Sequence, residues 1–186
     1  MGDPKRVAIL ISGRGSNMRA LVAHANAYEV VLVASNKPDA AGLQWARDHG
    51  LQTWAHDSKA IAREEYDRML SAALEEHEVG TIALAGFMRI LSPWFVQRWS
   101  GRIVNIHPSL LPKHRGLDTH ARAIAAGDEV SGCSVHIVTE ELDAGEVLGQ
   151  AEVPIDRGDT AAILEQRVLA AEHRLYPRVL NEFVTR

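Results

Sequence analysis

The chain has 186 residues, of which 46% are hydrophobic and 24% charged, and its formal net charge at pH 7 is −4. This length and composition indicate one globular domain, residues 1–186, with a sizeable core, and the negative charge argues against a nucleic-acid partner. The single cysteine, Cys133, excludes an intrachain disulfide, and no apolar run approaches the ~20 residues of a membrane span, so we expect a cytoplasmic protein.

A strand, a glycine-rich loop and a helix are predicted at the start of the chain. Residues 6–12, RVAILIS, form an apolar run of strand length, which is typical of a parallel sheet covered on both faces. The loop 13–17, GRGSN, follows, and apolar residues then recur at helical spacing from Met18. Backbone N–H groups and a helix N-terminus would meet here, which favours phosphate binding. A plain turn with Ser16 as the helix N-cap is the alternative.

Strands and helices then alternate along the chain. Further strands are predicted at 29–35, 51–54, 79–85 and 102–106, and helices at 40–49, around 66–74 and at 93–99, the last with Ser92 as N-cap. This alternation predicts a doubly wound α/β fold, a mostly parallel sheet with helices on both faces. Ligands of such sheets bind beyond the carboxyl ends of the strands, so the loops 13–17, 86–91 and 105–107 are expected to converge on one cleft.

The pattern changes after residue 107. A predicted helix at 118–126 is followed by strands at 131–139 and 147–155, and their connection is too short for a helical crossover, which predicts an antiparallel pair. Asp143 lies in this connection, where a turn-forming role would explain it. The last element, 160–185, has a helical apolar face, and Pro177 predicts a kink or a break within it.

Two polar residues end the fifth strand. Asn105 and His107 are two positions apart, so both side chains leave the same face of an extended chain, and Pro108 then ends the ladder. An amide with donors and an acceptor beside an imidazole suits polar catalysis. A strand that ends at a surface histidine before a turn fits the same residues. The histidine spacings and the single cysteine predict no metal site.

Six segments together resemble one family, the folate-dependent phosphoribosylglycinamide formyltransferases of purine biosynthesis. They are ISGRGSN, SNKPDAAGL, LAGFMRILSP, GRIVNIHPSLLPKHRGLDTH, SVHIVTEELDAG and AAEHRLYP. They follow one another in the family's order, and the resemblance extends over nearly the whole chain. The NxHPSLLP core with a downstream Asp is shared more widely among folate-dependent formyl transferases and hydrolases, while GRGSN and AGFMRILSP narrow the resemblance. It implies a Rossmann-like fold and transfer of the formyl group of 10-formyltetrahydrofolate to the amine of glycinamide ribonucleotide, by a monomer or homodimer.

The resemblance also implies the site residues. Asn105 and protonated His107 would stabilise the tetrahedral oxyanion, and Asp143 would raise the pKa of His107, which could act as general acid. The ribonucleotide side, with its phosphate loop in the N-terminal half, is assigned to Gly15, Ser16, Asn17 and Glu172. The folate side is assigned to Arg63, Met88, Arg89, Ile90, Leu91 and Asn105, and Ser134 is expected to add a polar contact in the cleft.

Two positions depart from the family pattern. Asp118 and Arg115 stand in the loop after His107, where relatives commonly carry His and Pro. Two other functions remain open. A formyltetrahydrofolate hydrolase would pass the formyl group to water, although such enzymes usually carry an extra N-terminal domain and this chain begins at its first strand. A non-catalytic folate or nucleotide-binding module would not need the intact Asn105, His107 and Asp143.

Overall fold

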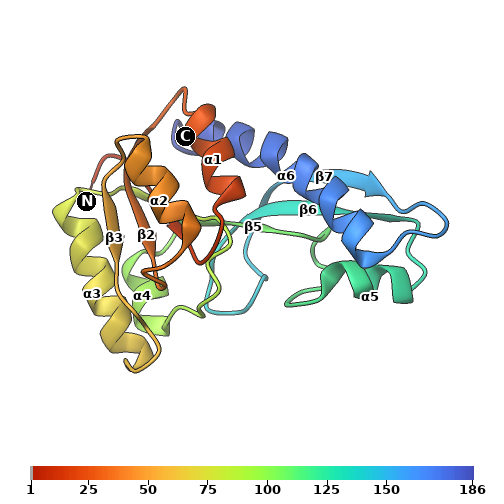
Figure 1. The fold of residues 1–186 in the computed structure, drawn as a ribbon, viewed down its shortest axis with the longest axis horizontal. Coiled ribbons are helices and arrows are strands. Elements are labelled where there is room, and N and C mark those ends of the chain that lie inside the picture. Colours follow the sequence, from red (N-terminus) through yellow and green to blue (C-terminus); the bar gives the residue numbers. More distant parts are fainter. Residues whose placement is uncertain (1) are drawn as a thin grey trace.

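A seven-stranded sheet is the frame of the molecule in a computed structural model that describes residues 2–186 (Figure 1). The strands are β1 (Arg6–Ile11), β2 (Glu29–Ser35), β3 (Thr53–Ala55), β4 (Thr81–Leu84), β5 (Ile103–His107), β6 (Val130–Ile137) and β7 (Val147–Pro154). The helices are α1 (Ser16–Ala23), α2 (Ala41–Asp48), α3 (Arg63–Glu76), α4 (Pro93–Arg98), α5 (Thr119–Ala125) and α6 (Ala161–Phe183).

The strand order explains where a ligand can bind. Across the sheet the order is β3-β2-β1-β4-β5-β6-β7, with β1 to β5 parallel and β6 antiparallel to both β5 and β7. The predicted class and the antiparallel pairing of β6 with β7 are therefore confirmed. The connections after β1 and β4 leave the sheet in opposite directions, which makes the carboxyl ends of these strands a topological switch point.

Helices cover both faces because the central strand is apolar on both sides. Val7, Ile9 and Ile11 of β1 contact the core beneath α1, α2 and α6, whereas Ala8 and Leu10 contact the core beneath α3 and α4. The helix α6 lies along the molecule from the β6–β7 hairpin to α1 (Figure 1). It therefore connects the antiparallel part of the sheet with the parallel part.

The structure excludes two alternatives that the sequence left open, namely Ser16 as the N-cap of α1 and a break of the last helix at Pro177. Gly15, with φ 73°, occupies the N-cap of α1, so Ser16 is the first helical residue and not the cap. The helix α6 continues through Pro177, which excludes a break. Pro177 and the neighbouring Tyr176 are buried, and this packing offsets the hydrogen bond that proline cannot donate. The predicted N-cap at Ser92 is confirmed, since its Oγ accepts from the Phe95 N–H at 3.3 Å.

Within residues 2–186, no helix is long and apolar enough to cross a membrane.

We expect Tyr176→Phe to lower the free energy of unfolding by about 1–3 kcal/mol. The buried Tyr176 hydroxyl lies 3.1 Å from the Leu84 carbonyl oxygen and 2.9 Å from that of Val104, so it connects α6 with β4 and β5. Urea unfolding of both proteins measures the difference. A loss below about 0.5 kcal/mol would mean that these carbonyls do not depend on the hydroxyl.

Candidate active site

The antiparallel register of β5 and β6 assembles the polar residues of the site. Asn105 lies opposite His136, and His107 lies opposite Ser134. The Asn105 Nδ2 is 3.1 Å from the His136 Nε2. The two residues that sequence spacing placed on one face therefore meet a second polar pair on the neighbouring strand.

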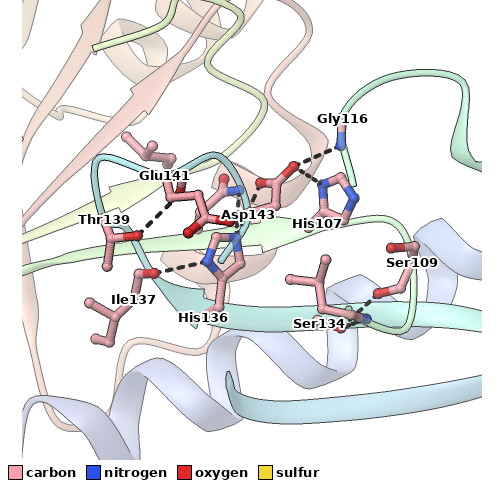
Figure 2. Close-up of polar contacts among 12 residues, drawn as sticks. His107, Ser109, Gly116, Ser134, His136, Ile137, Thr139, Glu141 and Asp143 are labelled. Atoms are coloured by element: carbon pink, nitrogen blue, oxygen red, sulfur yellow. Dashed lines mark hydrogen bonds and ion pairs between the residues drawn. The ribbon is translucent and has the colours of Figure 1, made fainter. Parts of the chain in front are cut away.

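Asp143 lies between two imidazole rings (Figure 2). Its Oδ2 is 3.4 Å from the His107 Nδ1 and accepts from the Gly116 N–H at 2.9 Å, while its Oδ1 is 3.5 Å from the His136 Nε2. Only 7% of the Asp143 side chain is exposed. The structure thus brings Asn105, His107 and Asp143 together, and Asp143 does more than form a turn.

The His107 ring is held at both nitrogens. Its Nε2 is 3.0 Å from the carbonyl oxygen of His114, and a carbonyl can only accept, so Nε2 carries a proton. The Nδ1 facing Asp143 is then the nitrogen that gains or loses a proton. This arrangement fixes the tautomer of His107 without a substrate.

The pKa of His107 differs from the expectation. Burial lowers the pKa of His107, and the His114 carbonyl and the Asp143 charge raise it by less, so the net pKa lies below the usual value of histidine. We had expected Asp143 to raise it overall. The carboxylate acts in the predicted direction, but desolvation of the ring outweighs it.

Asp143 itself stays ionised at neutral pH. Burial acts to raise the pKa of Asp143, but hydrogen bonds from His136 and the Gly116 amide, together with the His107 and His136 charges, hold it below its usual value. The buried negative charge therefore has donors on several sides, as buried charges require.

His136 was missed in the sequence. Its Nδ1 is 2.9 Å from the Ile137 carbonyl oxygen, so Nδ1 carries a proton, and its Nε2 lies 3.1 Å from the Asn105 Nδ2 and 3.5 Å from the Asp143 Oδ1. This contact orients the Asn105 amide and leaves its second N–H for a ligand. The alternation of Ser134 and His136 along β6 was visible, but only the register with β5 assigns them to the site.

The residues predicted for the ribonucleotide lie where α1 meets α6. The Asn17 Nδ2 donates to the Glu172 Oε2 at 2.7 Å, beside Gly15 and Ser16 at the start of α1. Within residues 2–186, the buried Asn17 Oδ1 has no hydrogen-bond partner, so it can accept from a ligand. Burial raises the pKa of Glu172 to about 6.

The residues predicted for folate are of two kinds. Met88 and Ile90 are 67% and 64% exposed and can cover an apolar ligand, while Leu91 belongs to the core. Arg89 instead stabilises the protein: its guanidinium donates to the carbonyl oxygens of Ser58 and Ile61 at 3.2 and 3.3 Å and lies over the Tyr66 ring. Both terminal nitrogens of the guanidinium are therefore already engaged within the protein.

Arg63 and Asp118 lie outside the central cluster. Arg63 is the first residue of α3 and is exposed, which leaves both a ligand contact and a solvated charge open. Asp118 is exposed at the N-cap of α5, with φ 57°. The carboxylate beside His107 is that of Asp143 and not that of Asp118.

The expected cleft contact of Ser134 was wrong. Ser134 is fully buried, and its Oγ donates to the Ser109 carbonyl at 2.6 Å and accepts from the Leu111 N–H at 3.0 Å. A further donor, the Gln150 Nε2, lies at 2.8 Å. Ser134 therefore anchors the loop after His107 to β6, which is a structural role.

The arrangement suits chemistry at a carbonyl carbon. An amide donor, an imidazole with one titrating nitrogen and a buried carboxylate are the groups that acyl transfer requires. Within residues 2–186, no three His, Cys, Asp or Glu side chains come together in a group that could hold a metal ion.

The chain belongs to the formyl transferase family, whose model matches residues 5–180. It is 46% identical over 182 residues to phosphoribosylglycinamide formyltransferase of Escherichia coli, covering 95% of this chain and 86% of that protein. It is 45% identical over 181 residues to the human trifunctional purine biosynthetic protein adenosine-3, covering 95% of this chain but only 18% of that protein. The crystal structure of phosphoribosylglycinamide formyltransferase from Brucella melitensis, 47% identical, matches with a TM-score of 0.91 over 98% of this chain and 96% of that one.

We expect Glu172→Gln to stabilise the protein at pH 7 by about 2 kcal/mol. This figure follows from the rise in the pKa of Glu172 from 4.5 to about 6 on folding. Because the folded pKa lies above the unfolded one, the native state binds more protons between these values, and stability falls as pH rises through that window. Glutamine can still accept from Asn17. Urea unfolding at pH 4.5 and pH 7 measures the difference between variant and parent. An equal difference at both pH values would contradict the prediction.

Proposed function

We propose that this chain transfers the formyl group of 10-formyltetrahydrofolate to the amine of glycinamide ribonucleotide, giving the N-formyl ribonucleotide and tetrahydrofolate. The observation that carries the proposal is the polar cluster at the carboxyl end of β5. Asp143 lies 3.4 Å from His107 and 3.5 Å from His136, and His136 lies 3.1 Å from Asn105. The similarity to the Escherichia coli enzyme over 86% of its length supports the choice of substrates. We place the enzyme in the cytoplasm, as a monomer or homodimer.

The proposed mechanism uses the site as follows. The amine attacks the formyl carbon, and the carbonyl oxygen becomes an oxyanion in a tetrahedral intermediate. The free N–H of Asn105 and the imidazolium of His107 stabilise this charge. The bond from the formyl carbon to the folate nitrogen then breaks as His107 gives that nitrogen a proton, directly or through water. The attacking amine loses one proton, which restores the His107 imidazolium, and Asp143 balances the imidazolium charge.

The substrates are assigned to the two sides of the switch point. The loop at Gly15, Ser16 and Asn17 offers backbone N–H groups to the phosphate, and Glu172 and the Asn17 Oδ1 face the sugar or amine side. Met88 to Leu91 offer apolar walls and backbone groups to the folate, with Arg63 as a further contact. The N–H of the Met88 backbone already donates to the Ser12 Oγ at 2.7 Å, which connects the two loops.

One assay separates the three candidate functions. Folate absorbance is followed with and without glycinamide ribonucleotide. Turnover that requires the ribonucleotide supports the transferase. Turnover in water alone would indicate the hydrolase, and binding without turnover would indicate a binding module.

We expect Asn105→Ala to lower kcat roughly 10²–10³-fold and His107→Ala on the order of 10²–10⁴-fold, because each loses a donor needed in the transition state. The KM values should change little. Steady-state kinetics with each substrate varied in turn checks this. A change confined to KM would assign these residues to ground-state binding.

We expect Asp143→Asn to lower kcat and to move the alkaline limb of the pH–rate profile, which follows loss of the His107 proton, to lower pH. The carboxylate raises the pKa of His107, so its loss lets burial lower that pKa further. The double variant that combines Asp143→Asn with His107→Ala should lower kcat by less than the product of the two single decreases, since the residues act as a unit. An unchanged profile would leave Asp143 only a structural role.

We expect Gly15→Val to raise the KM for the ribonucleotide far more than that for the folate. Gly15 has φ 73°, a backbone conformation that valine rarely adopts, and a Cβ there would lie 2.9 Å from the Met18 Cε, so the backbone at position 15 is strained and the Met18 side chain must move. Kinetics with each substrate, beside a melting curve, separate binding from stability. Equal increases in both KM values would remove the loop from the phosphate site.

A further inference from the structure

The loop after β5 binds both members of the His107–Asp143 pair. The His114 carbonyl accepts from the His107 Nε2 at 3.0 Å, and the Gly116 N–H donates to the Asp143 Oδ2 at 2.9 Å. Both loop residues have left-handed backbones, with φ 51° and φ 80°. The segment 113–116 belongs to no helix or strand, so side-chain contacts must hold the His114 carbonyl in place.

Asp128, two residues after the C-cap of α5, supplies such contacts. Its Oδ2 is 2.7 Å from the His114 Nε2, and its Oδ1 accepts from the Lys113 Nζ at 3.0 Å. The His114 and Asp128 side chains are only 15% and 14% exposed, whereas Lys113 is 64% exposed. One carboxylate therefore fixes two consecutive residues of the loop, and the shielded bond to His114 is the stronger constraint.

The two ends of His114 have different partners. Its ring bonds to Asp128, and its backbone carbonyl bonds to His107. The ring is thus not in the proton path of the reaction. Any movement of the ring away from Asp128 instead reaches His107 through the carbonyl.

We propose that Asp128 is a positioning residue for the reaction. By holding His114, it keeps the carbonyl on the His107 Nε2 and so leaves Nδ1 as the titrating nitrogen beside Asp143. The consequence for turnover rests on the proposed function, but the effect on His107 does not.

A second anchor keeps the loop folded when Asp128 is changed. Arg122 of α5 donates to the carbonyl oxygens of Arg115 at 2.6 Å and Leu117 at 3.2 Å. The Ser109 Oγ also donates to the Lys113 carbonyl at 2.7 Å. Loss of the Asp128 carboxylate should therefore loosen His114 without unfolding the loop.

The direct test is the titration of His107 in the free protein. The charged and titratable groups around its ring are Asp143 and His136, with His120 and Arg122 on α5. The His114 carbonyl raises the pKa of His107, so Asp128→Asn should lower that pKa. Imidazole NMR of labelled protein measures it.

Glu129→Gln is the matched control. Glu129 is the adjacent, exposed residue, and the substitution removes the same charge without touching His114. Asp128→Glu, which keeps the carboxylate, should leave the pKa of His107 close to its value in the parent protein. If Asp128→Asn does not fold, His114→Phe removes the other half of the same contact and should give the same shift.

Kinetics complete the test. Asp128→Asn should lower kcat about tenfold or more with KM values kept, because small displacements of catalytic groups are costly, and Glu129→Gln should match the parent. If the pKa of His107 in Asp128→Asn equals that in Glu129→Gln, the proposal is overturned, even if kcat or the melting temperature of Asp128→Asn falls. If Asp128→Asn shifts the pKa of His107 but the parent protein transfers no formyl group, the proposed function is rejected. The role of Asp128 in positioning His107 then still stands.

Discussion

A buried negative charge at Asp143 is the constraint on which the site depends. A carboxylate with so little exposure is stable only if polar partners surround it, and here they come from three separate parts of the chain. His107 ends β5, His136 lies on β6, and Gly116 belongs to the loop between them. These partners come together only when β5 and β6 pair in the observed register. Ionisation of Asp143 and correct strand pairing therefore depend on each other.

A second long-range contact, between α1 and α6, lies on the other side of the switch point. Asn17 and Glu172 are 155 residues apart and bond to each other at 2.7 Å. Their contact requires α6 to reach from the β6–β7 hairpin to α1, as it does in Figure 1. Glu172 precedes Pro177 in α6, so the part of the helix before the proline makes this reach possible. Packing of one long helix thus sets the distance between the proposed ribonucleotide side and the His107–Asp143 pair.

The sequence predicted whatever depends on short-range pattern. The alternation of strands and helices, the shared face of Asn105 and His107, and the cap at Ser92 follow from periodicity and local chemistry. The sequence could not supply register, so His136 was missed and Ser134 was misplaced. It also could not show competition between effects. Burial outweighs the Asp143 charge at His107, and bonds to loop carbonyls occupy the Arg89 guanidinium. These outcomes depend on tertiary contacts that spacing does not encode.

Backbone strain is concentrated around the His107–Asp143 pair. Among residues 2–186, four residues other than glycine have positive φ, and three of them, His114, Asp118 and Asp143, lie in the two loops beside His107. Such conformations cost of order 1–3 kcal/mol each and persist only where surrounding contacts enforce them. At Asp143 the two imidazoles and the Gly116 amide provide the enforcement, and at His114 the Asp128 carboxylate does. The interactions that set the proton chemistry therefore also hold the loops in conformations that the isolated chain would avoid. A loop sequence that relaxed this strain would release the His114 carbonyl and the Gly116 amide, and with them the orientation of His107 and Asp143.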